Sequence, residues 1–273
     1  MVAAAARTET EEVSAWRPEV PGVVEVFHAH FVEHAYPMHA HDAWTLLIVD
    51  DGAVRYDLDR HERGALGDLV TLLPPHVPHN GRAATPLGFR KRVLYLETDR
   101  LGADLVGTAV DTPGLADPLL HRRVHQIHRA LALPGEELEA ESRLALVCER
   151  LRGHLLREPA AGAPSTLLPA GERTLARQLR DLLDARTVEG VTLQWAAEQL
   201  HAHPSHLVRV FSREVGMAPH SYLTSRRVEA ARRMLLDGMP PGVVAANAGF
   251  YDQAHLTRHF RRIVGTSPGR FRR

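Results

Sequence analysis

One pattern of residues occurs twice near the end of this 273-residue sequence. The copies share apolar, arginine, glycine and proline positions, and each position of the second copy lies 49 residues after its counterpart. The paired positions are Leu207 with Leu256, Arg209 with Arg258, Phe211 with Phe260, Gly216 with Gly265, Pro219 with Pro268 and Tyr222 with Phe271. An internal repeat of this kind predicts that one structural unit is built twice.

Each copy has the pattern of two short helices joined by a turn. In the first copy, apolar residues at helical spacing predict a helix over 193–201, Pro204 interrupts it, and a second helix is expected over 205–215, ending at Gly216. The second copy repeats this plan, with a turn at Gly249 and a second helix over 252–264. Both copies therefore predict a helix-turn-helix, and the amphipathic stretch 220–236 predicts a helical connector between them.

The polar face of the second helix in each copy is rich in arginine. These polar residues are Ser205, His206, Arg209 and Arg213 in the first copy, and Gln253, His255, Arg258, Arg261 and Arg262 in the second. Arginine and glutamine can donate to base edges, and further arginines suit phosphates. A solvated helix face is the alternative, but two such faces on a duplicated helix-turn-helix favour DNA binding.

Charge is distributed unevenly along the chain. From Gly171 onward there are 16 arginines and nine acidic residues, a net charge of +7; because the whole chain has a net charge of zero, the preceding residues carry −7. A basic C-terminal part joined to an acidic N-terminal part is consistent with phosphate contact at one end only.

The repeat and its connector resemble the DNA-binding domain of AraC/XylS-type transcriptional regulators. The residues that carry the resemblance are Leu207, Arg209, Phe211, Gly216, Pro219, Tyr222, Arg226, Arg227, Ala231 and Leu235, then Ala248, Gly249, Phe250, Leu256, Arg258, Phe260, Gly265, Pro268 and Phe271. The resemblance implies two helix-turn-helix units that enter adjacent major grooves. By position it assigns base contact to Ser205, Val208 and Arg209, and to Gln253, His255, Thr257 and Arg258. Ser205 and Val208 are shorter than the side chains that family members often have, so Arg209 is the main candidate in the first unit.

The N-terminal part reads as short strands separated by turns. Strands are expected over 23–31, 43–49, 53–58, 68–73 and 90–96, and Asp51-Gly52 predicts a hairpin turn because it supplies positive-φ positions. Many short strands without intervening helices predict a barrel or sandwich. We expect residues 1–12 to be frayed.

Two groups of histidines stand on these strands. His39 and His41 are two positions apart, which aligns their side chains on one face of an extended strand, and Pro74-Pro75-His76-Val77-Pro78-His79 supplies a second pair. This arrangement resembles a cupin, the sensor barrel of many AraC/XylS-type proteins, and that match places His39, His41 and His79 at metal-ligand positions. The cupin glutamate after the second histidine is absent, since Thr45 and Leu46 occupy that region, and His76 replaces a usual glycine.

Three histidines suit Zn²⁺ or another divalent metal with one coordination position left open. The alternative is that they line an organic-ligand pocket or satisfy backbone partners. A small effector is expected in the mouth of the barrel. Its predicted contacts are His39, His41, Trp44, Tyr56, His79 and Arg92, with Arg92 chosen over Tyr95 because neighbouring strand residues face opposite ways.

Two helices are expected in the middle of the chain, over 115–133 and 136–157. The second has an apolar stripe of Leu144, Val147, Leu151 and Leu155, which either packs on its own barrel or, as in the resembling family, pairs two subunits into a homodimer. A stretch rich in alanine, glycine and proline then predicts an inter-domain linker.

The sequence therefore predicts an α+β multidomain protein. Its expected parts are a cupin-like effector-binding β-barrel in 1–114, a helical dimerisation segment in 115–158, a linker in 159–170 and an all-α double helix-turn-helix domain in 171–273.

The function that we expect is sequence-specific transcription regulation in response to a small effector, with promoter DNA and a second copy as partners and RNA polymerase as a further candidate. No apolar run approaches a membrane span, and the single cysteine, Cys148, fits a reducing, cytoplasmic compartment. No catalytic constellation is apparent, so no enzyme activity is expected. Two alternatives stay open: a metal-dependent cupin enzyme (a dioxygenase or isomerase) with an appended DNA-binding domain, and a DNA-binding protein whose barrel serves only dimerisation.

Overall fold

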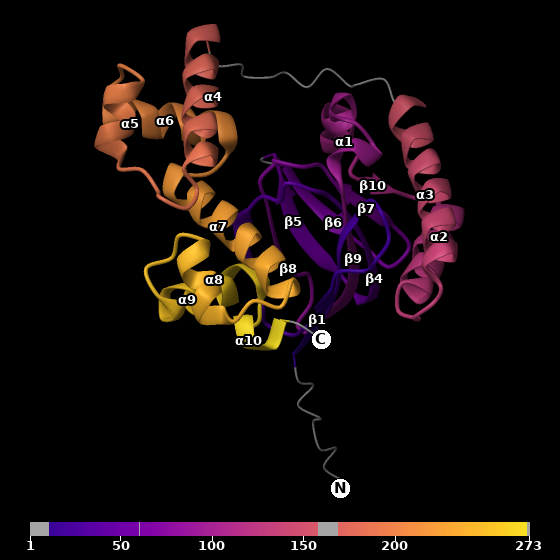
Figure 1. Cartoon of the computed structure of the whole chain (residues 1–273). Coiled ribbons are helices and arrows are strands. Elements are labelled where there is room, and N and C mark those ends of the chain that lie inside the picture. Colours follow the sequence, from indigo (N-terminus) through magenta and orange to yellow (C-terminus); the bar gives the residue numbers. More distant parts are fainter. Residues whose placement is uncertain (1–10, 60, 158–168, 272–273) are drawn as a thin grey trace, which may run out of the picture.

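The computed structural model of the chain describes residues 11–59, 61–157 and 169–271. The predicted linker therefore lies outside the described residues except for its last two positions, and Ala170 already belongs to the first helix that follows it. The described part consists of an N-terminal β-domain with covering helices and a C-terminal helical domain (Figure 1).

Two antiparallel sheets form the β-domain. The six-stranded sheet has the order β1 (Glu12–Trp16), β2 (Val23–Phe31), β9 (Phe89–Leu96), β4 (Trp44–Gly52), β7 (Val70–Leu73) and β10 (Gly114–Leu115). The four-stranded sheet has the order β3 (Tyr36–His39), β8 (His79–Ala83), β5 (Val54–Leu58) and β6 (His61–Ala65). The five strands expected from the sequence are present, and β1, β3, β6, β8 and β10 are additional.

The six-stranded sheet is covered on both faces. Trp44, Leu46 and Ile48 of β4 share one apolar cluster with the helices that follow the β-domain, whereas Leu47 and Val49 share another with the four-stranded sheet and the helical domain. Six consecutive residues, 44–49, are therefore buried. The continuous apolar run in the sequence reflects this double coverage rather than a half-exposed strand.

Two sequence expectations about turns and ends are wrong. Gly52 has the predicted positive φ of 72°, but β4 and β5 belong to different sheets, so Asp51-Gly52 joins two sheets instead of closing a hairpin. Glu12 begins β1, which pairs with β2, so only residues 1–10 lie outside the described part at that end.

The middle of the chain is helical. Short turns η1 (Thr98–Arg100), η2 (Ala103–Leu105) and α1 (Val106–Asp111) lead to α2 (Pro118–Ala130) and α3 (Glu137–Arg157). The Asp117 carboxylate caps α2 by accepting from the Leu119 and Leu120 amides. The apolar stripe of α3 (Leu144, Val147, Leu151 and Leu155) packs into the cluster that contains Trp44. The stripe is therefore buried within its own chain.

Seven helices make up the described C-terminal domain. They are α4 (Ala170–Ala185), α5 (Leu193–Gln199), α6 (Pro204–Val215), α7 (Pro219–Leu236), α8 (Pro241–Asn247), α9 (Gln253–Val264) and α10 (Pro268–Phe271). Figure 1 shows the α5–α6 unit near one end of α7 and the α8–α9 unit near the other.

The sequence repeat reappears as repeated helix ends. Gly216 and Gly265 close α6 and α9 in the left-handed conformation, with φ of 82° and 89°, because only glycine adopts that region without a steric penalty. At the other end of α9, the Asp252 carboxylate accepts from the His255 amide, while α6 begins with Pro204 at its first position. Both predicted helix-turn-helix units are thus present.

The helical domain packs directly on the β-domain. Residues of α7, α8, α9 and α10 share one apolar cluster with β2, β4, β5 and β9. At the closest approach, Phe31 of β2 lies against Gly265, where a Cβ atom would come within 2.5 Å of the ring. The two domains therefore have a continuous core.

Candidate functional site

A small cavity of about 40 Å³ lies between the two sheets and the helical domain. Its ionisable lining residues are Tyr36, His39, His41, Tyr56, His79, Lys91, Tyr95 and Arg232. The first seven belong to the β-domain, whereas Arg232 belongs to α7, and α9 adds Ile263 and Val264. Residues of both domains thus enclose the same space.

Three buried histidines form one group in the cavity wall. His39 and His79 are paired across β3 and β8, and His41 follows β3; a ring nitrogen of each lies within 4.8 Å of the others. The Nδ1 atom of His39 is hydrogen bonded to the Pro37 carbonyl (2.7 Å), and that of His79 to the Val77 carbonyl (3.1 Å). The Nδ1 atom of His41 is hydrogen bonded to the Glu229 carboxylate (3.0 Å). This confirms that the two histidine motifs of the sequence meet in space.

Burial keeps these imidazoles neutral. It is the main cause that lowers the pKa of His79 to about 4 and the pKa values of His39 and His41 well below the usual range, with a smaller contribution from His79 at His39 and from Arg232 at His41. A neutral imidazole is the form that binds a metal ion. Thr45 also lines the cavity, and no carboxylate of β4 does so, in agreement with the missing cupin glutamate.

Two cationic side chains face the same space. Burial, together with the smaller effect of the Arg232 charge, lowers the pKa of Lys91 to about 7. The Lys91 ammonium lies 4.1 Å from the centroid of the Tyr36 ring. Arg232 lies over the Tyr95 ring and pairs with Glu25 at 2.5 Å. Burial raises the pKa of Glu25 to about 7 against the opposing effect of Arg232.

The structure places two of the predicted effector contacts elsewhere. Trp44 is fully buried in the cluster on the other face of the six-stranded sheet, where its Nε1 donates to the Thr98 carbonyl. Arg92 also points to that other side and pairs with Asp50 and His125. Because side chains alternate along a strand, the cavity receives Thr45 and Leu47 from β4, and Lys91, Val93 and Tyr95 from β9.

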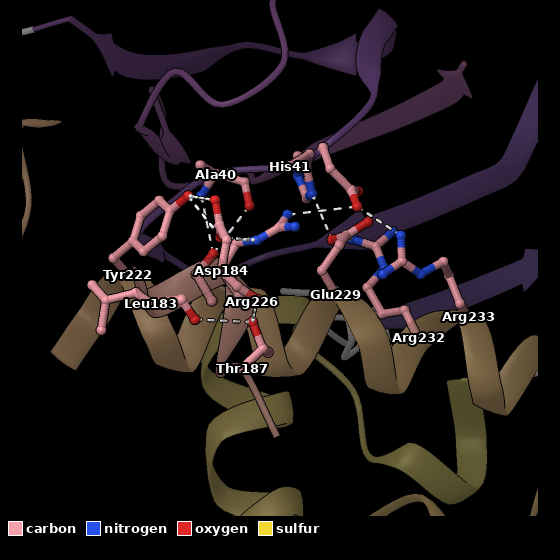
Figure 2. Close-up of polar contacts among 12 residues, drawn as sticks. Ala40, His41, Leu183, Asp184, Thr187, Tyr222, Arg226, Glu229, Arg232 and Arg233 are labelled. Carbon is pink, nitrogen blue, oxygen red and sulfur yellow. Dashed lines mark hydrogen bonds and ion pairs between the residues drawn. The ribbon is translucent and has the colours of Figure 1, made fainter. Parts of the chain in front are cut away.

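The sequence reading missed the contacts that α7 makes with the segment around His41 (Figure 2). Ser225 accepts from the Ala40 amide (3.1 Å) and donates to its carbonyl (3.0 Å). Beyond Glu229, which accepts from His41, Arg233 pairs with Asp42 at 2.6 Å. A lone glutamate in an arginine-rich helix was the available signal, since Glu229 lies between Arg226-Arg227 and Arg232-Arg233.

The polar faces of α6 and α9 are largely free of the β-domain. Exposed side chains among the predicted DNA contacts are Ser205, Arg209, Arg213, Gln253, Arg258, Arg261 and Arg262, and half-buried ones are His206, Val208, His255 and Thr257. His255 packs edge-on against His259, and its Nδ1 accepts from the Tyr251 amide. His255 therefore supports the turn before α9 as well as lying on its polar side.

Two protein-family models match the chain. An AraC-like ligand-binding domain matches residues 21–147, and a helix-turn-helix domain matches residues 196–273. These ranges cover the β-domain from β2 onward with α2 and the first half of α3, and the helices from the middle of α5 to α10.

Curated relatives are also regulators. The HTH-type transcriptional regulator Rv1931c of Mycobacterium tuberculosis is 42% identical over 78 residues, which are 28% of this chain and 30% of that protein. The uncharacterised HTH-type transcriptional regulator YbfI of Bacillus subtilis is 25% identical over 247 residues, which are 85% of this chain and 86% of that protein.

Among solved structures, ToxT from Vibrio cholerae is similar in fold. Its structure matches 94% of this chain and 95% of its own, with a TM-score of 0.55 and 9% identity. This likeness concerns the fold alone. The two family models and the curated relatives show that the chain is an AraC-type transcription regulator with an N-terminal ligand-binding domain and a C-terminal helix-turn-helix domain. Within the described residues, no helix has the length and apolar character needed to cross a bilayer.

Proposed function

We propose that this regulator binds its DNA sites through α6 and α9, and that a ligand in the cavity controls how the two helices are presented. The observation that carries this proposal is the composition of the cavity wall, because Arg232, Ile263 and Val264 of the helical domain complete a cavity of the ligand-binding domain. A ligand at that place touches both domains. The relatives support regulation rather than catalysis as the role of the chain.

Helix α7 is the element through which the ligand acts. It supplies Arg232 to the cavity, bonds His41 and Ala40 through Glu229 and Ser225, and separates the two helix-turn-helix units in sequence. A ligand can shift the arrangement of the domains only if it binds the alternative arrangements with different affinity. Contacts between the ligand and α7 supply this difference in affinity, because they depend on where α7 lies.

Cavity size restricts the ligand in this arrangement. About 40 Å³ holds an ion or a few waters, whereas pockets for drug-sized molecules measure roughly 300–1,000 Å³. One ToxT structure contains an unsaturated fatty acid; an organic ligand of that kind requires α7 to move away from the β-domain of this chain. Small ligands fit with α7 in place.

We extend the proposal to the partners. The proposed homodimer forms through the outer face of α3, where Leu138, Leu146 and Leu156 are exposed, because the inner apolar stripe of α3 is already buried within its own chain. RNA polymerase is the further partner that we expect at a promoter. The cytoplasm is the proposed compartment, because a bacterial-type promoter lies there. Light scattering of the wild type and of a Leu146→Glu variant tests whether the homodimer forms through this face.

The test of this function uses the full chain with genomic DNA fragments at moderate salt. We expect selected fragments to be retained over competitor DNA, and at least one member of a panel of divalent metals and small carboxylates to raise the Tm and to change the affinity for the fragment. Absence of any sequence preference contradicts DNA regulation. If the chain prefers certain sequences and remains a dimer but responds to no ligand, the barrel serves only as a dimerisation module.

A further inference from the structure

The three cavity histidines share an arrangement of hydrogen bonds that leaves the same atom available on each ring. Carbonyl oxygens accept only, so the Nδ1 atoms of His39 and His79 carry hydrogens that they donate to Pro37 and Val77. His41 donates its Nδ1 hydrogen to the Glu229 carboxylate. Each neutral ring is thereby held as the tautomer whose Nε2 has a free lone pair.

All three rings line the same buried cavity, and acceptor nitrogens in such a space favour an electron-poor partner. One nitrogen of each ring lies within 4.8 Å of the others, and the rings are 4.5–5.2 Å apart between centroids. Three acceptors offer one another no hydrogen bond. A cation with soft or borderline character satisfies all three together, and imidazole nitrogen is a preferred ligand of Zn²⁺, Co²⁺, Ni²⁺ and Fe²⁺.

The second coordination shell is that of a metal site. Metal-bound histidines commonly donate their other ring hydrogen to a carbonyl or carboxylate, which fixes the ring and strengthens the ligand. Two backbone carbonyls and one carboxylate fill these roles here. The carboxylate comes from the other domain, because Glu229 belongs to α7.

The charged groups around the histidines are of both signs. Arg232 lies between Glu25 (2.5 Å) and Glu229 (3.9 Å), so two carboxylates face one guanidinium. Lys91 is the other cationic group in the wall. Its ammonium lies over the Tyr36 ring, and its charge lowers the pKa of each of the three histidines.

The cupin resemblance implies a divalent metal ion at His39, His41 and His79, and we propose that Glu229 of α7, which accepts from His41, couples the binding of that ion to the contact between the two domains. This rests on the proposed function, since the ion is the cavity ligand that acts through α7. A metal-bound imidazole is a stronger donor, so the ion strengthens the bond from His41 to Glu229. By reciprocity, the docked α7 strengthens metal binding.

The experiment titrates the chelator-treated full chain with Co²⁺ and Zn²⁺. We expect one ion per chain by elemental analysis, a Co²⁺ visible spectrum of a histidine-bound ion, and a raised Tm. His79→Ala, and the more conservative His39→Gln, should each reduce the affinity at least 100-fold. If the wild type binds no ion, or if both folded variants bind as tightly as the wild type, the site is overturned.

Glu229→Gln tests the coupling without removing a ligand. It should weaken metal binding about 10–100-fold and reduce the effect of the ion on DNA affinity. The matched control is Arg17→Gln, which removes another ion pair between the domains (Arg17–Asp237, 2.7 Å) far in sequence from the histidines and should leave metal affinity unchanged. Equal affinity in Glu229→Gln and wild type overturns the coupling.

DNA binding is measured separately by gel shift with and without Zn²⁺. If the chain prefers its DNA site but Zn²⁺ changes the DNA affinity of the wild type and of His79→Ala equally, metal control is contradicted. The proposed DNA regulation then still stands. A chain that binds one Zn²⁺ tightly but shows no DNA preference contradicts the proposed function while the metal site stands.

Discussion

Glu25 of β2 and Arg232 of α7 form an ion pair between the two domains, with each side chain only 4% exposed. The pair lies beside the cavity, and Arg232 also covers the Tyr95 ring. Two charges so deeply buried depend on each other, because neither has water to replace its partner. Loss of the Arg232 side chain therefore changes both the contact between the domains and the wall of the cavity.

Replacing Arg232 with methionine should destabilise the chain by about 3–5 kcal/mol, since it leaves Glu25 buried without its partner. The double variant Glu25→Gln/Arg232→Met should recover part of that loss. Chemical unfolding of the four proteins in the cycle measures the coupling. If the double variant is as unstable as the sum of the single variants, the pair contributes nothing.

The same variant has an expected pH dependence. Burial raises the pKa of Glu25 from 4.5 to about 7, and removal of Arg232 raises it further because the principal opposing effect is lost. An acid with a raised folded-state pKa contributes stability at low pH that is lost as the pH rises through that pKa. The deficit of Arg232→Met relative to wild type should thus grow between pH 6 and pH 8. A constant deficit over this range is the contrary result.

The two repeat-related glycines give a matched pair of substitutions. Gly216→Ala should cost about 1 kcal/mol from left-handed strain alone, because the atom nearest to its Cβ position outside the adjoining chain belongs to Pro78 and is 3.9 Å away. Gly265→Ala has the same strain and must also displace the buried ring of Phe31, 2.5 Å away. Thermal unfolding should show a clearly larger loss for Gly265→Ala. Equal losses contradict the close approach of the two domains.

The start of α9 depends on the carboxylate of Asp252. Asp252→Ala removes the cap on the His255 amide and should cost about 1 kcal/mol of stability. Asp252→Asn keeps an acceptor and should cost less. Calorimetry compares the two, and equal destabilisation indicates that the negative charge matters more than the hydrogen bond.

Arg258 is expected to contact a base, whereas Arg213 is expected to contact a phosphate. Arg258→Ala should cost about 1–3 kcal/mol on the true site and relax sequence preference. Arg213→Ala, at the far end of α6 from its first turn, should weaken binding to all sequences alike. Anisotropy titrations on specific and random DNA distinguish the two, and equal weakening by Arg258→Ala on both DNAs marks it as a phosphate contact.

Much of the helical domain could be predicted from the sequence, because its signals are local. The repeat fixes the helix ends through Gly216 and Gly265, and Pro204 marks the start of α6. The cupin resemblance of the histidine motifs, rather than a local pattern, placed His39, His41 and His79 together, because their meeting depends on the pairing of β3 with β8 across a long stretch of sequence.

The orientation of Trp44 and Arg92 could not be predicted in the same way. Strand alternation gives two sets of residues but does not say which set faces the cavity. Normally the polar set faces water, but both faces of this sheet are covered, so Trp44 and Leu47 are both buried. The polarity pattern therefore carries no information about the face.

The contact of α7 with the β-domain also lay beyond the sequence. The sequence predicts only a helical connector over 220–236, yet its Arg232 is buried against Glu25, a residue 207 positions away. Pairing over such a separation depends on how the two domains dock, and no local pattern encodes it.

Binding-site selection from random DNA by the full chain tests the central claim most directly. The account predicts an enriched sequence with two blocks about one helical turn apart, one of which disappears with Arg209→Ala and the other with Arg258→Ala. Enrichment of no sequence over the starting pool, at a protein concentration that retains DNA, would contradict it.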